Sequence, residues 1–136
     1  MANEATLWME YLPPIPMSCA DGTGIEKGTV LKLTDPMTAS AADGTEGDPV
    51  AGICASEKIA DDGNTKVAVY RSGIFKMTAS GSIAAGDPVA TSDGGAANKV
   101  IKAATNEEDI LGTSLETASD GHTFLVELNP RGISLA

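Results

Sequence analysis

The pentapeptide Gly-Asp-Pro-Val-Ala occurs twice in this chain, at residues 47–51 and 86–90. Proline is tolerated at the first position of a β-strand, because its missing N–H group need not be paired there. In both copies a short apolar run with β-branched residues follows the proline. The motif therefore predicts the beginning of a strand and carries no chemistry of its own.

The sequence around this motif indicates an internal duplication. An offset of 39 residues, set by the pentapeptides alone, aligns little else, whereas an offset of about 58 to 60 residues aligns several further segments. The matched segments are 25–31 with 83–89, 50–53 with 110–113, 60–63 with 118–121, and Val67 and Val69 with Val126 and Leu128. We interpret the chain as two copies of one β unit, at roughly residues 22–73 and 80–128. The alternative is that small β proteins reuse the same turn residues, so that any two halves look alike.

Short apolar runs separated by turn residues predict an all-β fold. The expected strands are 29–34, 50–55, 65–70, 73–78, 87–91, 98–103, 110–115 and 123–128. Five Asp-Gly pairs punctuate the chain, and Asp-Gly favours tight turns because both residues tolerate positive φ. We expect a small β-barrel or β-sandwich of about eight short strands. Residues 35–47 are expected to form a mobile, exposed loop, and residues 105–109 are the only helix-like stretch.

Residues 1–20 differ from the rest of the chain. They hold the only Trp, one of the two Tyr and three of the seven Pro. Three prolines within residues 13–16 forbid a helix and favour an extended path. We therefore predict an extended N-terminal arm at 1–20, followed by a single β-rich domain at 21–136. Deleting residues 1–17 is expected to leave a folded barrel.

The composition of this arm favours a role in binding. Trp, Tyr and Met are enriched at the centres of protein interfaces, so we expect the arm to dock on a partner or a neighbouring subunit. The alternative is an arm that folds back over an open end of its own barrel. The residues predicted to contact the partner are Leu7, Trp8, Met9, Tyr11, Leu12, Pro13, Pro14, Ile15 and Met17.

Charge and cysteine content exclude several classes of function. The chain carries 19 acidic and 9 basic residues, a net charge of −10, and its basic residues are scattered. A phosphate backbone would be repelled, so we expect no nucleic-acid partner. Cys19 and Cys54 have no metal or redox spacing; two buried thiols are favoured over one disulfide. We expect neither a signal peptide nor a membrane span.

The sequence gives little support for enzyme chemistry. The single histidine, His122, directly follows an Asp-Gly turn, and an exposed turn residue is the favoured interpretation. Residues 61–64, Asp-Asp-Gly-Asn, offer oxygen ligands for Ca²⁺, but the full ligand loop is absent and a solvated hairpin turn is favoured. We expect no catalytic residues, no cofactor site and no metal site.

Taken together, the sequence resembles the capsid decoration proteins of tailed bacteriophages, also called cement or head-stabilising proteins. The shared pattern comprises Ile25-x-x-Gly28, Pro49-Val50-x-Gly52-Ile53-x-Ala55, Val67-x-Val69, Ser72-Gly73-Ile74-Phe75, Ile83-x-x-Gly86-Asp87-x-Val89, Ile110-x-Gly112, and Gly121 before Val126. The resemblance covers roughly residues 22–128.

This resemblance implies a non-enzymatic structural protein of the virion. It implies a compact β-rich domain on the outer capsid surface, made in the host cytoplasm, which binds the major capsid protein, bridges its subunits and usually forms a homotrimer. It also implies that an N-terminal arm grips the capsid or a neighbouring subunit. A β-barrel module that binds carbohydrate or a cell surface is the alternative function.

Overall fold

The fold is all-β, as predicted, but the described residues form eleven strands where about eight were expected. The computed structural model describes residues 3–42, 49–91, 98–103 and 110–130. The strands are β1 (Thr6–Met9), β2 (Ile15–Ser18), β3 (Val30–Thr34), β4 (Thr38–Ala41), β5 (Val50–Cys54), β6 (Lys66–Tyr70), β7 (Gly73–Ala79), β8 (Pro88–Thr91), β9 (Lys99–Lys102), β10 (Ile110–Ser114) and β11 (Thr123–Leu128). No helix occurs among these residues, so none could cross a membrane.

Each of the eight predicted strands is present, and the three additional strands lie in segments that were interpreted otherwise. β1 and β2 lie in the expected arm, and β4 lies in the expected loop at 35–47. These three strands were missed because they lack clear alternation of apolar and polar side chains. Residues 43–48 of the expected loop and the helix-like stretch at 105–109 lie outside the described residues.

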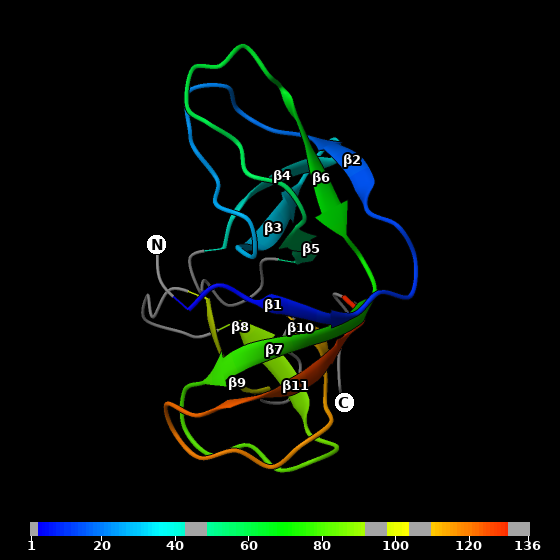
Figure 1. Cartoon of the computed structure of the whole chain (residues 1–136), viewed down its shortest axis with the longest axis vertical. Helices are drawn as coiled ribbons and strands as arrows, with labels where there is room; N and C mark the ends of the chain where they lie inside the picture. Colours follow the sequence, from blue (N-terminus) through cyan, green and yellow to red (C-terminus); the bar gives the residue numbers. More distant parts are fainter. Residues whose placement is uncertain (1–2, 43–48, 92–97, 104–109, 131–136) are drawn as a thin grey trace.

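The strands form two closed five-stranded barrels, which lie one above the other in Figure 1. The first barrel has the order β2-β4-β3-β5-β6, and β6 pairs with β2 to close it. The second has the order β7-β9-β8-β10-β11, and β11 pairs with β7. Each strand of the first barrel thus has a counterpart in the second, in the same order and with the same parallel pair, β2–β4 or β7–β9.

Local geometry supports the predicted duplication. An isolated bridge joins Ile25 to Lys58 in the first barrel, and its counterpart joins Ile83 to Ala118 in the second. Gly52 and Gly112 are a second matched pair, because a Cβ at either would collide with the backbone oxygen of the neighbouring strand, at Tyr70 or Glu127. Only glycine allows this close approach of two backbones.

The two copies have boundaries that differ from the predicted ones. They run from β2 to β6 and from β7 to β11, so the first copy begins inside the expected arm. Cys54 pairs with Val69 and its counterpart Ser114 pairs with Val126, which matches Val69 to Val126. The predicted match of Val69 with Leu128 is therefore wrong. It failed because the second copy has one residue fewer between its Asp-Gly turn and its last strand.

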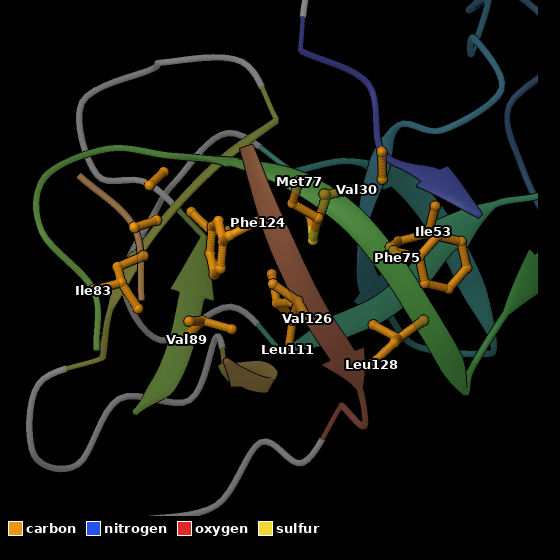
Figure 2. Packing of buried hydrophobic residues seen from close by; sticks show 14 of the residues in the cluster. Val30, Ile53, Phe75, Met77, Ile83, Val89, Leu111, Phe124, Val126 and Leu128 are labelled. Atoms are coloured by element: carbon orange, nitrogen blue, oxygen red, sulfur yellow. The ribbon is translucent and has the colours of Figure 1, made fainter. Parts of the chain in front are cut away.

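Two main cores hold the molecule together. One fills the first barrel and includes Met17, Cys19, Leu31, Ala51, Cys54, Val67 and Val69. Both cysteines are buried and free. The other core fills the second barrel and continues into the first, where it includes Val30, Val50 and Ile53 together with Phe75 and Met77 (Figure 2). The two barrels therefore share buried apolar surface.

Polar contacts also cross between the barrels. The side-chain oxygen of Asn98, which precedes β9, accepts a buried 2.9 Å hydrogen bond from the backbone N–H of Val30 in β3. The backbone N–H of Ala5 donates to the Gly28 carbonyl at 2.8 Å. One residue later β1 begins, and it pairs with β7 of the second barrel. The N-terminal segment thus contacts both barrels.

Candidate binding surface

Six large apolar side chains are exposed within nine residues near the N-terminus. They are Leu7, Trp8, Met9, Tyr11, Leu12 and Ile15, and we call this set the N-terminal apolar surface. Leu12 is 65% exposed and Trp8 is 58% exposed. The other exposed large apolar residues in the described part of the chain are Met37, Ile59 and Leu115, which are far apart in sequence. The exposed large apolar residues of the described chain are thus concentrated in this segment.

Nearly all of the residues predicted to contact a partner are exposed. Leu7, Trp8 and Met9 belong to β1, and the connection between β1 and β2 carries Tyr11, Leu12, Pro13 and Pro14. Pro13 is exposed and Pro14 is half-buried. Met17 differs, because it points into the first barrel and is only 3% exposed. Met17 is therefore a core residue and does not belong to the surface.

The expected free arm is fixed to both barrels. β1 pairs with β7, and β2 pairs with β6 and β4. β2 supplies one wall of the first barrel, so deleting residues 1–17 would open that barrel. The position of β2 thus argues against the expectation that this deletion leaves a folded barrel. The three prolines were taken to favour an extended path, but an extended segment can also be a barrel strand when its prolines lie on an edge.

The connection between β1 and β2 is tied down by two tyrosines. The Tyr11 hydroxyl donates to the Glu127 carboxylate at 2.9 Å, and this bond raises the pKa of Tyr11 above its ordinary value. Burial raises the pKa of Tyr70, and its hydrogen bond with Glu10 raises that pKa further. These contacts join the connection between β1 and β2 to β6 and β11.

A bulge in β1 sets the position of Trp8. Leu7 lies opposite Phe75 and Met9 lies opposite Ile74, so Trp8 is the extra residue in the register. Bulges bend a strand and redirect a side chain, and they are common beside functional sites. The bulge gives Trp8 a local geometry that differs from its two neighbours in β1.

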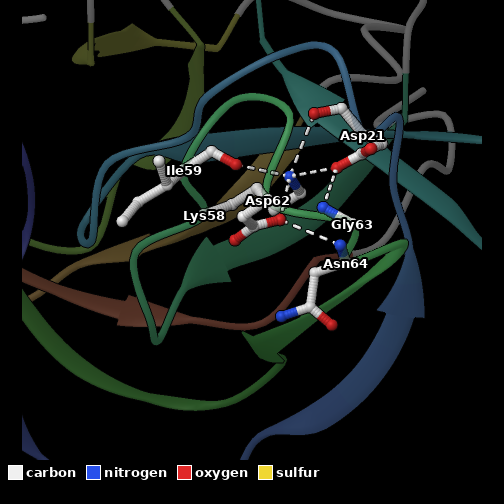
Figure 3. A network of polar contacts seen from close by, with 6 residues as sticks. All are labelled: Asp21, Lys58, Ile59, Asp62, Gly63 and Asn64. Atoms are coloured by element: carbon white, nitrogen blue, oxygen red, sulfur yellow. Dashed lines mark hydrogen bonds and ion pairs between the residues drawn. The ribbon is translucent and has the colours of Figure 1, made fainter.

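The turn at residues 61–64, which the sequence offered as a possible Ca²⁺ site, is occupied by a lysine side chain. Lys58 Nζ donates to Asp62 Oδ1 at 2.7 Å, to Asp21 Oδ1 at 3.0 Å, and to the carbonyls of Asp21 and Ile59 (Figure 3). The Lys58 side chain is 1% exposed. This ammonium group takes the place in which a cation would need to bind. Among the described residues no cluster of His, Cys, Asp or Glu could hold a metal ion.

Lys58 and Asp62 each stabilise the charged form of the other. Burial disfavours the charge on Lys58, but its hydrogen bonds to Asp62 and Asp21 outweigh this effect and raise the Lys58 pKa. The bond from Lys58, helped by the Asn64 N–H, lowers the pKa of Asp62. The cluster therefore pins the turn at 61–64 to the loop at Asp21. The lone His122 is exposed in the matching turn of the second barrel, as predicted.

The chain is similar to known phage proteins. The sequence profile of the phage cement proteins matches residues 13–129. No curated protein matches the chain. Among solved structures, the base of the head fibre gp8.5 of bacteriophage phi29 is similar, with a TM-score of 0.53 and 15% sequence identity, over 90% of this chain and 96% of that chain. At this identity the likeness shows the fold alone.

The profile match covers most of the chain, including both barrels and all strands except β1. It agrees with the resemblance found in the sequence, and the phi29 base supplies an independent likeness of fold. It also accounts for the weak support for enzyme chemistry, since proteins of this kind are structural components of the phage capsid. This chain belongs to the phage cement protein family.

Proposed function

We propose that this protein binds the outer surface of a phage capsid and stabilises the shell by bridging subunits of the major capsid protein. The observation that carries the proposal is the N-terminal apolar surface, exposed on a chain of the cement family. It is unfavourable to expose so many apolar side chains to water. A protein partner that covers them therefore lowers the free energy of the system.

The proposed mechanism is mechanical. Each copy adds contact area across the seam between capsid subunits, and many equal sites share the load, so modest single contacts suffice. We further propose that the copies assemble as trimers on the shell, as the family resemblance implies. The net charge of −10 suits an outer position, because only an inner protein meets the phage DNA.

The test is co-sedimentation of the purified protein with capsids that lack it. We expect saturable binding with a fixed copy number. Trp8→Ala should weaken binding by about 2 kcal/mol, or roughly 30-fold, because interface tryptophans contribute heavily to affinity. Ile59→Ala is the matched control, since Ile59 is 62% exposed and lies outside the N-terminal apolar surface.

Two results would contradict the proposal. Equal binding by Trp8→Ala and Ile59→Ala would show that the N-terminal apolar surface is not the contact. Failure of the unaltered protein to bind capsids, together with saturable binding to a soluble glycan, would favour a carbohydrate-binding module instead.

A further inference from the structure

In the part of the chain that the structure describes, strand β1 has an edge that no other strand covers. In the second sheet β1 lies at the end of the strand order, and among the described residues it pairs with β7 alone (Figure 1). Its four residues are all exposed. An edge strand of this kind presents unpaired N–H and C=O groups to which another extended chain can add.

The hydrogen bonds of β7 show which groups of β1 face this edge. The N–H of Ala79 points to His122, beside β11, whereas the N–H of Ser80 points to Val100 in β9. Alternate residues of a strand point to opposite sides, so Ile74 and Lys76 face β1. Their partners Met9 and Thr6 face back toward β7. Leu7 lies opposite Phe75, so its N–H and C=O face the other edge. Ala5 lies on that same edge, where its N–H already donates to the Gly28 carbonyl, so the open part of the edge begins at Leu7.

We propose that the open edge of β1 accepts an extended segment of the capsid protein as an added β-strand. This inference rests on the proposed function and names the mode of contact. Main-chain hydrogen bonds at Leu7 would set the register, while apolar side chains of the incoming strand would cover Leu7 and Trp8. Glu10, which directly follows β1, is exposed, and the chain has a net charge of −10, so the segment that fits carries Lys or Arg beside its apolar residues.

A second copy of this chain is a poorer occupant. In the described residues both barrels are closed, which leaves a copy with only β1 or the edge of β2 to offer. The N–H of Ser18 points to Met37 beside β4, so residues 14 and 16 lie on that same edge of β2, and both are prolines without an N–H group. Pairing β1 antiparallel with itself about Leu7 would set Glu4 against Glu10, an unfavourable like-charge pair.

The decisive experiment compares Leu7→Pro with Leu7→Ala in the capsid co-sedimentation assay. Both variants remove the leucine side chain, but only proline removes the outward N–H. Pairing with β7 uses Thr6 and Met9, so both variants should keep the thermal stability of the folded protein. We expect Leu7→Pro to bind roughly tenfold more weakly than Leu7→Ala, because a hydrogen bond is lost and the ring blocks the incoming strand.

Amide hydrogen exchange gives a second measurement on the unaltered protein. The Leu7 amide should exchange rapidly in the free protein and at least roughly tenfold more slowly on capsids. Equal capsid binding by the two Leu7 variants, or an unprotected Leu7 amide on capsids, would overturn the strand-addition proposal while leaving the proposed function intact. A fall in oligomer size of the free protein caused by Leu7→Pro alone would instead identify a second copy as the occupant. Failure of the unaltered protein to bind capsids would overturn both proposals.

Discussion

The two barrels share one topology but complete the same strand edge in different ways. In the second barrel, the edge of β7 beyond β9 is covered by β1, which pairs with Ile74 and Lys76. In the first barrel, the corresponding positions of the first strand are Pro14 and Pro16. Proline has no N–H to donate, so this edge needs no covering strand.

This difference shows how a duplicated fold handles the edge that it repeats. Each copy begins with a strand whose outer edge is only partly covered by the parallel strand β4 or β9. One copy resolves this with two prolines and the other with an additional strand. The additional strand then presents an open edge of its own. The asymmetry between otherwise matched barrels thus lies in the same segment as the N-terminal apolar surface.

The largest effect that we expect comes from the matched glycines of the two barrels. Gly52→Ala and Gly112→Ala each place a Cβ against a backbone oxygen that cannot move without breaking a strand pair. Each should lower the free energy of unfolding by about 3 kcal/mol. Since one core runs through both barrels, we predict a single unfolding transition, measured by urea denaturation, that either variant shifts as a whole.

Gly63→Ala is a milder control for these variants, because nothing lies within 4 Å of a Cβ there, although its φ of 84° carries some strain. If Gly52→Ala unfolded the first barrel and left a separate transition for the second, the barrels would be independent domains. That outcome would contradict the predicted single domain at 21–136.

An intermediate effect is expected at Lys58, whose counterpart in the second barrel is Ala118. Lys58→Met should lower the urea midpoint at neutral pH, because Asp21 and Asp62 lose a buried partner. The lowered pKa of Asp62 stabilises the fold above the ordinary carboxyl range, and this contribution is lost as pH falls through the lowered value. The raised pKa of Lys58 contributes below the ordinary lysine range and is lost only in strong alkali.

The difference in midpoint between the unaltered protein and Lys58→Met should therefore shrink as the pH is lowered from 7 toward 3. Lys102→Met is the control, because Lys102 is 61% exposed and lies 3.9 Å from Asp87, a pair that should contribute little. Equal shifts for the two variants, or a difference that does not depend on pH, would show that the Lys58 cluster does not stabilise the first barrel.

The smallest effect on stability is expected at the proline edge. Replacing both prolines, in Pro14→Thr with Pro16→Thr, should change the free energy of unfolding by only about 0.5 kcal/mol, since the edge is exposed. It should nevertheless restore N–H donors and allow concentration-dependent association, measured by light scattering. A double variant that stays unassociated at high concentration would show that the prolines do not guard this edge.

Much of the fold could be predicted from the sequence because its strands follow simple local rules. The positions of eight strands were predicted closely. The evidence was the alternation of apolar and polar side chains, as in Lys66–Tyr70 and Thr123–Leu128, and the Asp-Gly turns. The sequence could not show that the prolines of β2 face one edge, because that depends on which side β6 occupies. It also gave no sign of β4, since Thr38–Ala41 has small side chains and no clear alternation.

The candidate surface was predicted from composition, and composition cannot show how deeply each residue of a strand is buried. Ile15 and Met17 have the same apolar character and lie on the same face of β2, yet Ile15 is 38% exposed and Met17 is 3% exposed. Their difference follows from position along the strand, because Ile15 is its first residue and Met17 packs in the core of the first barrel. The open edge of β1 was also beyond the sequence, because the pairing of β1 with β7 joins residues that are far apart in the chain.

The hydrogen bond from Ala5 to Gly28 has a consequence for how force would travel through the molecule. A pull applied to β1 would pass along its length to β7 and, through Ala5, to the loop before β3. The load would thus be divided between both barrels and would not act on a single flexible tether. A shell that expands under internal pressure would then strain two folded barrels at once, and each would resist with a full set of strand pairs.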